Sequence, residues 1–145
     1  MGDISKDIHS KFDNNKVKAL INILYTANWI TNIQNTFFKP YGISPQQYNI
    51  LRILKGANEP LKVQIIKERM IERSPNATRL MDKLCAKQLI DRIPCPDDRR
   101  VVHIIITDKG KQLLHDISDD FNDEILKNIT ENEATQLSDL LDKLR

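Results

Sequence analysis

The chain has 145 residues, 40% of them apolar and 29% charged, with a formal net charge of +2. This length and composition predict one ordinary globular domain, and so small a net charge confines any nucleic-acid site to a local patch. The two cysteines and three histidines show no spacing typical of zinc or metalloprotease sites, so we expect no metal and no cofactor. The sequence has no apolar run of about 18 residues and no apolar leader, so we expect a cytoplasmic protein.

A long helix is expected over residues 16–38, after a polar N-terminal stretch. Its apolar residues recur at helical spacing on one broad face: Val17, Leu20, Ile21, Ile23, Leu24, Ala27, Ile30 and Ile33. A helix that is apolar on more than one side is either a central core helix or a helix shared with a second subunit. The residues alone leave both interpretations open.

Two shorter helices are predicted next. Ser44 is expected to cap a helix that begins at Pro45, with Gln47 completing a capping box. The buried side of this helix is expected to consist of Tyr48, Leu51, Ile53 and Leu54. After a turn at residues 56–60, a second helix is predicted over residues 61–71. Its Lys67 and Arg69 are either solvated or contacts to a DNA backbone.

The next helix is predicted from Ser74, as N-cap, to Lys87, with Pro75 at the first helical position. Its buried face is expected to consist of Ala77, Leu80, Met81 and Leu84. The opposite face carries side chains that can reach base edges and phosphates: Asn76, Thr78, Arg79 and Lys83.

Two strands are predicted after this helix, over residues 89–93 and 101–106, because the period of the apolar residues changes and β-branched residues dominate. The tip between them, residues 94–100, is too charged to belong to a core. A helix suited to the major groove followed by a basic β-hairpin is typical of a winged helix-turn-helix. The expected fold is therefore mainly α with a small β-hairpin wing, and the expected partner is double-stranded DNA.

The C-terminal part is predicted to be helical. Thr107 is expected to cap a helix that begins at Asp108 and continues through Leu113 or Leu114, Ile117, Phe121 and Ile125. Thr130 and Glu133 form a second capping box, which opens a last helix with the stripe Leu137, Leu140, Leu141 and Leu144. This stripe is expected to pair with the first long helix and with a partner chain.

We therefore expect a single domain over residues 1–145. Residues 16–39 and 108–145 would supply dimerisation helices, and residues 40–107 would form the DNA-binding lobe. No internal repeat or linker interrupts the sequence.

Three segments together resemble the MarR family of bacterial transcription regulators: Leu89-Ile90-Asp91-Arg92, Pro96-Asp97-Asp98-Arg99-Arg100 and Ile106-Thr107-Asp108-Lys109-Gly110. The resemblance covers about residues 16–145 and is strongest over residues 74–114. The sequence departs from the family pattern at Gln88, where a small residue or glycine is usual, at Lys62, where a Ser or Thr cap is common, and at Cys85, where a polar residue is usual.

The resemblance implies a homodimer with interleaved terminal helices and two winged lobes on one pseudo-palindromic operator. By position, Arg100 matches a wing arginine that enters the minor groove, and Asp98 matches an aspartate that braces it. Ser74, Asn76, Thr78 and Arg79 match major-groove positions. Whether Arg79 or Lys83 instead binds phosphate stays open. For Arg99 and Arg100 the alternative is a solvated turn, but their place on a hairpin tip favours DNA contact.

Members of this family often bind small aromatic effectors between the dimer layer and the DNA lobes. The resemblance therefore implies a ligand-responsive repressor, and it makes Tyr25, Trp29 and Tyr48 candidates for an effector pocket. Core packing explains aromatic residues of this kind equally well.

Two other functions are compatible with the sequence. A thiol switch would use Cys85 or Cys95, and it requires a depressed thiol pKa. A winged helix can also serve as a protein-interaction module without binding DNA. We do not expect an enzyme, because no nucleophile–base pair, phosphate loop or ligand cluster is present in the sequence.

Overall fold

The computed structural model describes residues 2–73, 75–117 and 120–145. The chain divides into two compact units: residues 33–118 form one, and residues 1–32 together with residues 119–145 form the other. Within the described ranges, no helix has the length and apolar character needed to cross a membrane.

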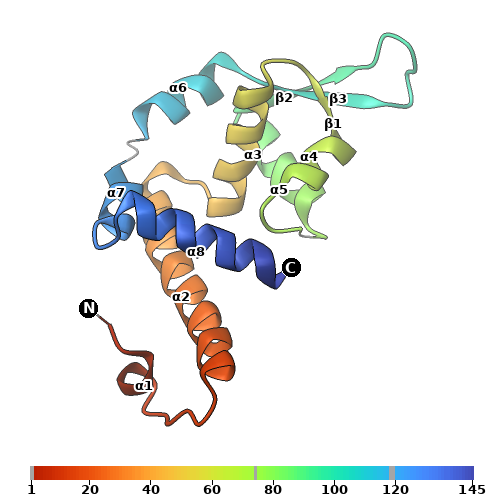
Figure 1. The fold of residues 1–145 in the computed structure, drawn as a ribbon. Helices are drawn as coiled ribbons and strands as arrows, with labels where there is room; N and C mark the ends of the chain where they lie inside the picture. The colour runs from red at the N-terminus through yellow and green to blue at the C-terminus, as the bar shows by residue number, and fades with distance from the viewer. Residues whose placement is uncertain (1, 74, 118–119) are drawn as a thin grey trace. The chain divides into compact units, whose positions relative to one another are not determined.

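The unit of residues 33–118 is a winged helix. It contains η1 (Lys39–Tyr41), α3 (Pro45–Ala57), β1 (Leu61–Lys62), α4 (Val63–Arg69), α5 (Ala77–Ala86), β2 (Ile90–Pro94), β3 (Val102–Ile106) and α6 (Asp108–Asp116). Its strands form an antiparallel sheet in the order β1-β3-β2, and the β2–β3 hairpin extends beyond the helices of the unit (Figure 1). The prediction of a mainly helical fold with a β-hairpin wing is confirmed.

Helix α3 is the centre of this unit, because it packs against α4, α5, α6 and β3. The predicted capping box is confirmed: the Ser44 hydroxyl accepts from the Gln47 backbone N–H at 3.1 Å, and the Gln47 side chain accepts from the Ser44 backbone N–H at 2.9 Å. Leu51 and Leu54 are buried as predicted. Tyr48 and Ile53, also predicted to be buried, are only half-buried. Ile50 completes the buried face instead, since α3 is enclosed by elements on more than one side.

The predicted helix over residues 61–71 is wrong at both ends. Leu61 and Lys62 form β1 and pair with Ile104 and His103 of β3, and the helix runs only over Val63–Arg69. The edge of β3 offers unpaired backbone groups, and two extended residues satisfy them before the helix begins. Lys62 is the N-cap of α4 and makes no side-chain capping bond.

The start of the next helix is also corrected. α5 begins at Ala77, so Pro75 lies in the preceding turn and not at the first helical position. Asn76 is the N-cap, without a capping bond from its side chain to the helix. Ser74, the predicted N-cap, lies outside the described residues. The predicted apolar face is confirmed for Ala77, Met81 and Leu84, which are buried, whereas Leu80 is only half-buried.

The second unit holds α1 (Ile4–Asp7), the first part of α2 (Asn15–Phe38), α7 (Asp120–Leu126) and α8 (Glu131–Leu144). The capping box of α8 is confirmed, since the Thr130 hydroxyl accepts from the Glu133 backbone N–H and the Glu133 carboxylate accepts from the Thr130 backbone N–H. The single helix predicted after Thr107 is instead two helices: α6 ends at Asp116 and α7 begins at Asp120.

Candidate nucleic-acid interface

The exposed side of α5 carries the residues predicted to face DNA. Thr78, Arg79 and Lys83 are exposed on the helix, and Asn76 is exposed at its N-cap. Asn76, Arg79 and Lys83 are three and seven positions apart, so they share one face, while Thr78 lies on its flank. Because Ala77, Met81 and Leu84 bury the other face, α5 presents this polar surface in a fixed orientation.

The C-terminal end of α5 is closed by a Schellman motif. The backbone N–H of Leu89 donates to the carbonyl of Leu84 at 3.0 Å, and that of Gln88 donates to the carbonyl of Cys85 at 2.9 Å. Gln88 therefore stands at φ 61°, in the left-handed region that glycine adopts without strain. This explains why a glycine is usual at this position in the family that the sequence resembles.

The start of α6 holds the chain that leaves α5. The Thr107 hydroxyl donates to the carbonyl of Gln88 at 2.7 Å and accepts from the backbone N–H of Gly110 at 3.0 Å. The Thr107 backbone N–H donates to the carbonyl of Leu89 at 3.1 Å, and Lys109 Nζ donates to the carbonyl of Lys87 at 3.1 Å. The Thr-x-x-Gly motif therefore has a structural role here: it holds the chain segment that follows α5.

Two further contacts fix α5 to its neighbours. The Arg92 guanidinium of β2 forms an ion pair with the Asp82 carboxylate of α5, and this hydrogen bond raises the pKa of Arg92. Lys87 Nζ donates to the carbonyl of Gly42. Both contacts are exposed, so we expect them to orient the helix more than to stabilise the fold.

Side chains of α3 bond to the turn before α5 and to the first turn of α5. Gln46 Nε2 donates to the Glu72 carboxylate at 2.9 Å, and the Asn49 side-chain oxygen accepts from the Ile71 backbone N–H at 3.0 Å. The buried Gln47 also donates to the carbonyl of Leu80 at 3.5 Å. The sequence predicted Gln47 only as a capping residue, and these contacts join positions 22 to 33 residues apart, which local spacing does not reveal.

The wing carries its basic residues at an ordered turn. Ile90 to Pro94 pair with Ile106 to Val102, and the backbone N–H of Cys95 continues the ladder by donating to the carbonyl of Val101 at 3.0 Å. The Asp98 carboxylate accepts from the backbone N–H of Arg100 at 2.9 Å. In this structure Asp98 thus holds the backbone of the turn, while Arg99 and Arg100 are exposed at the tip.

The three aromatic candidates lie in different surroundings. Tyr48 belongs to the winged-helix unit: its ring centroid lies 4.5 Å from that of Phe38, and its hydroxyl accepts from Arg52 Nε at 2.8 Å. Tyr25 and Trp29 belong to the other unit and are exposed on α2. Core packing, the alternative explanation for these aromatic residues, therefore does not apply to Trp29 in the single chain, where its exposed fraction is 47%.

The two thiols are both half-buried and unpaired within the described residues. Burial raises the pKa of Cys85, and Asp82 and Asp91 act in the same direction, whereas Arg92 lowers it. A raised pKa reduces the thiolate fraction, which is the opposite of what a thiol switch requires. The described ranges also hold no cluster of His, Cys, Asp or Glu that could bind a metal ion.

Comparison with known proteins agrees with this geometry. A family model described as the MarR family matches residues 43–102. The HTH-type transcriptional regulator MhqR of Bacillus subtilis is 32% identical to this chain over 120 residues, covering 79% of this chain and 81% of that protein.

Solved structures show the same architecture. A MarR transcription factor from Planctomyces limnophilus has 29% identity and a TM-score of 0.70, covering 91% of this chain and 98% of that one. A mutant MarR from Escherichia coli, crystallised with operator DNA, has 24% identity and a TM-score of 0.79, covering 93% of this chain and 99% of that one. The chain described here belongs to the MarR family of transcriptional regulators and has the family's winged-helix DNA-binding fold.

Proposed function

We propose that this protein is a ligand-responsive repressor that binds a pseudo-palindromic operator as a homodimer. The observation that carries the proposal is the exposed face of α5, where Asn76, Arg79 and Lys83 lie opposite a buried apolar face and beside a basic hairpin. Amide and guanidinium groups make the bidentate base contacts by which major-groove helices read sequence. Thr78 would contribute from the flank of the same helix.

Exposed apolar residues support the homodimer. On α2, Val17, Leu20 and Leu24 each leave about half of their surface exposed, at 49 to 55%. On α8, Leu137, Leu140 and Leu144 are 50 to 66% exposed. Contiguous apolar surface of this kind marks an interaction site in a globular protein. A two-fold dimer would place two α5 helices in successive major grooves, about 34–36 Å apart.

The wing would supply the contacts outside the major groove. Arg100 would enter the minor groove, where a narrow groove concentrates negative potential, and Arg99 would contact the backbone. The bond from the Arg100 N–H to the Asp98 carboxylate supports this role, because it orders the turn before DNA arrives.

Regulation would come from a small aromatic effector, for which the candidate residues are Tyr25 and Trp29 on one unit and, taken separately, Tyr48 on the other. The support is chemical: exposed aromatic rings on α2 and a tyrosine flanked by the Arg52 guanidinium, 5.2 Å from the ring centroid, suit an aromatic ligand. Bound to the operator, the dimer would occlude the promoter. An effector releases it only by binding the free and DNA-bound states with different affinity.

The proposal is tested by titrating the protein against the DNA upstream of its own gene and an unrelated duplex, at two or more salt concentrations. We expect tight binding to the first duplex only, with log K falling steeply as log salt rises. Equal, weak binding to both duplexes would refute sequence-specific binding to an operator in this DNA. No binding even at low salt would instead favour a winged helix used as a protein-interaction module.

A further inference from the structure

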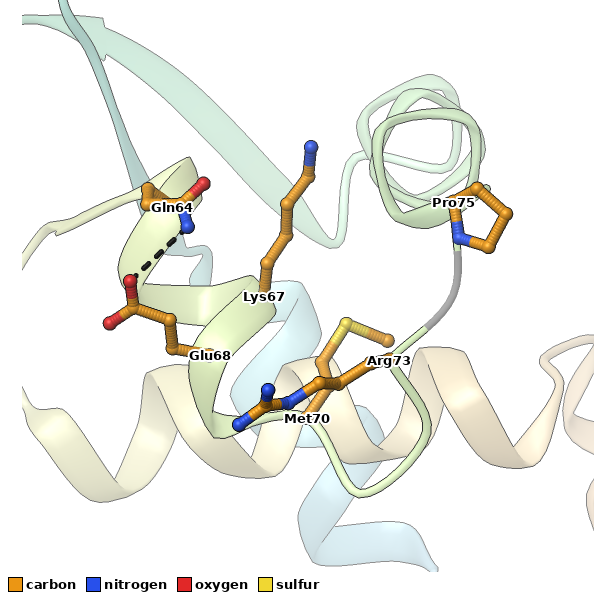
Figure 2. A pocket seen from close by; sticks show the side chains of 6 residues that line it. All are labelled: Gln64, Lys67, Glu68, Met70, Arg73 and Pro75. Atoms are coloured by element: carbon orange, nitrogen blue, oxygen red, sulfur yellow. Dashed lines mark hydrogen bonds between the residues drawn. The ribbon is translucent and has the colours of Figure 1, made fainter.

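A groove of about 310 Å³ lies between α4 and the segment that leads into α5 (Figure 2). Its lining consists of Gln64, Lys67, Glu68, Met70, Arg73 and Pro75. Met70 is only 5% exposed and forms an apolar wall, and Pro75 stands directly before Asn76. The groove is therefore next to the surface proposed to read DNA.

The groove holds more positive than negative charge. Its carboxylate, Glu68, accepts from Gln64 Nε2 at 3.2 Å, which Figure 2 shows as a dashed line within α4. Lys67 extends from α4 into the space between that helix and Pro75 (Figure 2). Among the residues that the structure describes, the side chains of Lys67 and Arg73 have neither an ion-pair nor a hydrogen-bond partner.

We propose that this groove binds a backbone phosphate of the operator, with Lys67 and Arg73 as its ligands. The proposal rests on the proposed function. A lysine supplies a point charge and an arginine a planar fork, and both suit phosphate oxygens. A phosphate bound beside Pro75 fixes the register of α5 along the groove but reads no base. The structure thus separates two residues that the sequence treated alike: Lys67 lines the groove, and Arg69 does not.

Hydrogen bonds to α3 hold two residues of the turn between α4 and α5, Ile71 and Glu72. The backbone of this turn is bonded to α3 through Asn49 and Ile71 at 3.0 Å, and its Glu72 side chain is held by Gln46 at 2.9 Å. Glu72 is thereby drawn to α3, and it is absent from the groove lining. The Glu72 carboxylate therefore does not occupy the groove in which Arg73 would bind the phosphate.

The test compares the salt dependence of DNA binding in Lys67→Ala, Arg73→Ala and the double variant, with Arg69→Ala as the matched control. Arg69 lies on the same helix and carries the same charge, outside the groove. Each phosphate contact contributes about 0.9 to the slope of log K against log salt. Because Lys67 and Arg73 share one phosphate, we expect the double variant to lower the slope by about 0.9 and each single variant by part of that. Each variant should weaken binding to the operator and to an unrelated duplex by the same factor. We expect Arg69→Ala to keep the wild-type slope and Lys67→Arg to restore it.

If the wild type binds the operator but the slopes of Lys67→Ala and Arg73→Ala match that of Arg69→Ala, the phosphate site is refuted and the proposed function stands. A wild type that binds no DNA would overturn the proposed function as well. Duplexes carrying single methylphosphonates locate the contact: one neutralised phosphate should weaken the wild type but leave the double variant unaffected. Calorimetry with inorganic phosphate tests whether the groove binds a free anion instead of DNA. Saturable phosphate binding that is lost in Lys67→Ala, together with an unchanged salt slope for DNA, would overturn the proposal and assign the groove to a small anion. Thermal unfolding of each variant confirms that it is folded.

Discussion

The Cα of Gly110 lies against the carbonyl oxygen of Leu89, so that a Cβ built on Gly110 would stand 2.3 Å from that oxygen and 2.8 Å from Ile106 Cγ1. Thr107, three residues earlier, bonds the same Leu89 carbonyl and the carbonyl of Gln88. Together these contacts fasten the start of α6 to the C-terminal end of α5 and the start of the wing.

Gly110→Ala should therefore destabilise the winged-helix unit by about 1–3 kcal/mol, the usual range for an overpacked core. The neighbour is backbone and cannot turn aside. Gly56→Ala is the control, because a Cβ at Gly56 meets no atom within 4 Å and Gly56 lies in α3. It should stabilise the protein by about 0.5–1 kcal/mol. Urea unfolding measures both changes, and equal stability of the two variants would refute the packing argument.

Gln88→Gly should raise the free energy of unfolding by about 1 kcal/mol. A non-glycine residue at a left-handed helix C-terminus has a strain that glycine lacks, and glycine's greater freedom in the unfolded chain offsets part of the gain. Guanidinium unfolding of the two proteins gives the difference. A loss of stability would mean that the Gln88 side chain contributes more than its backbone strain costs.

Cys85 should react slowly with iodoacetamide at neutral pH. Burial raises its pKa in the folded protein, so the thiolate is scarcer than in the unfolded chain at any pH below the ordinary value of 9.0. The same shift stabilises the folded protein at pH values below 9.0, and this stabilisation is lost as the pH rises through the folded-state pKa. Mass spectrometry against pH measures alkylation of Cys85. Folded protein reacting faster than urea-unfolded protein would revive the thiol switch.

Leu140→Glu should convert the proposed homodimer into a monomer at micromolar concentration. Leu140 is 66% exposed on the apolar stripe of α8, so the substitution places a charge in the proposed interface without disturbing a core. Thr135→Glu, on the opposite side of α8, is the control and should stay dimeric. Size-exclusion chromatography with light scattering separates the outcomes, and a dimeric Leu140→Glu protein would exclude this face.

Much of the fold could be predicted because its helices and strands depend on residues that are close together in the sequence. The following helix caps are each formed by two residues three positions apart, so the sequence alone reveals them: Ser44 with Gln47, Thr107 with Gly110 and Thr130 with Glu133. The strands of the wing differ from prediction by a single residue at their edges, because their β-branched composition is distinct.

The features that were missed depend on distant partners. β1 has only two residues and forms because it pairs with β3, so no alternation of apolar and polar residues could predict it. The contacts that hold the turn before α5, such as Gln46 with Glu72, join side chains 26 positions apart, a spacing that carries no local signal. The candidate site residues remain predictions, since their exposure is compatible with DNA contact but equally with solvent.

The central claim is that the exposed face of α5 and the wing bind an operator. Fluorescence anisotropy of the wild type and Arg100→Ala, on operator and unrelated duplexes across several salt concentrations, tests it most directly. We predict tight wild-type binding to the operator alone and a loss of about 1–3 kcal/mol in Arg100→Ala. Equal wild-type affinity for both duplexes, with unchanged affinity and salt slope in Arg100→Ala, would contradict it.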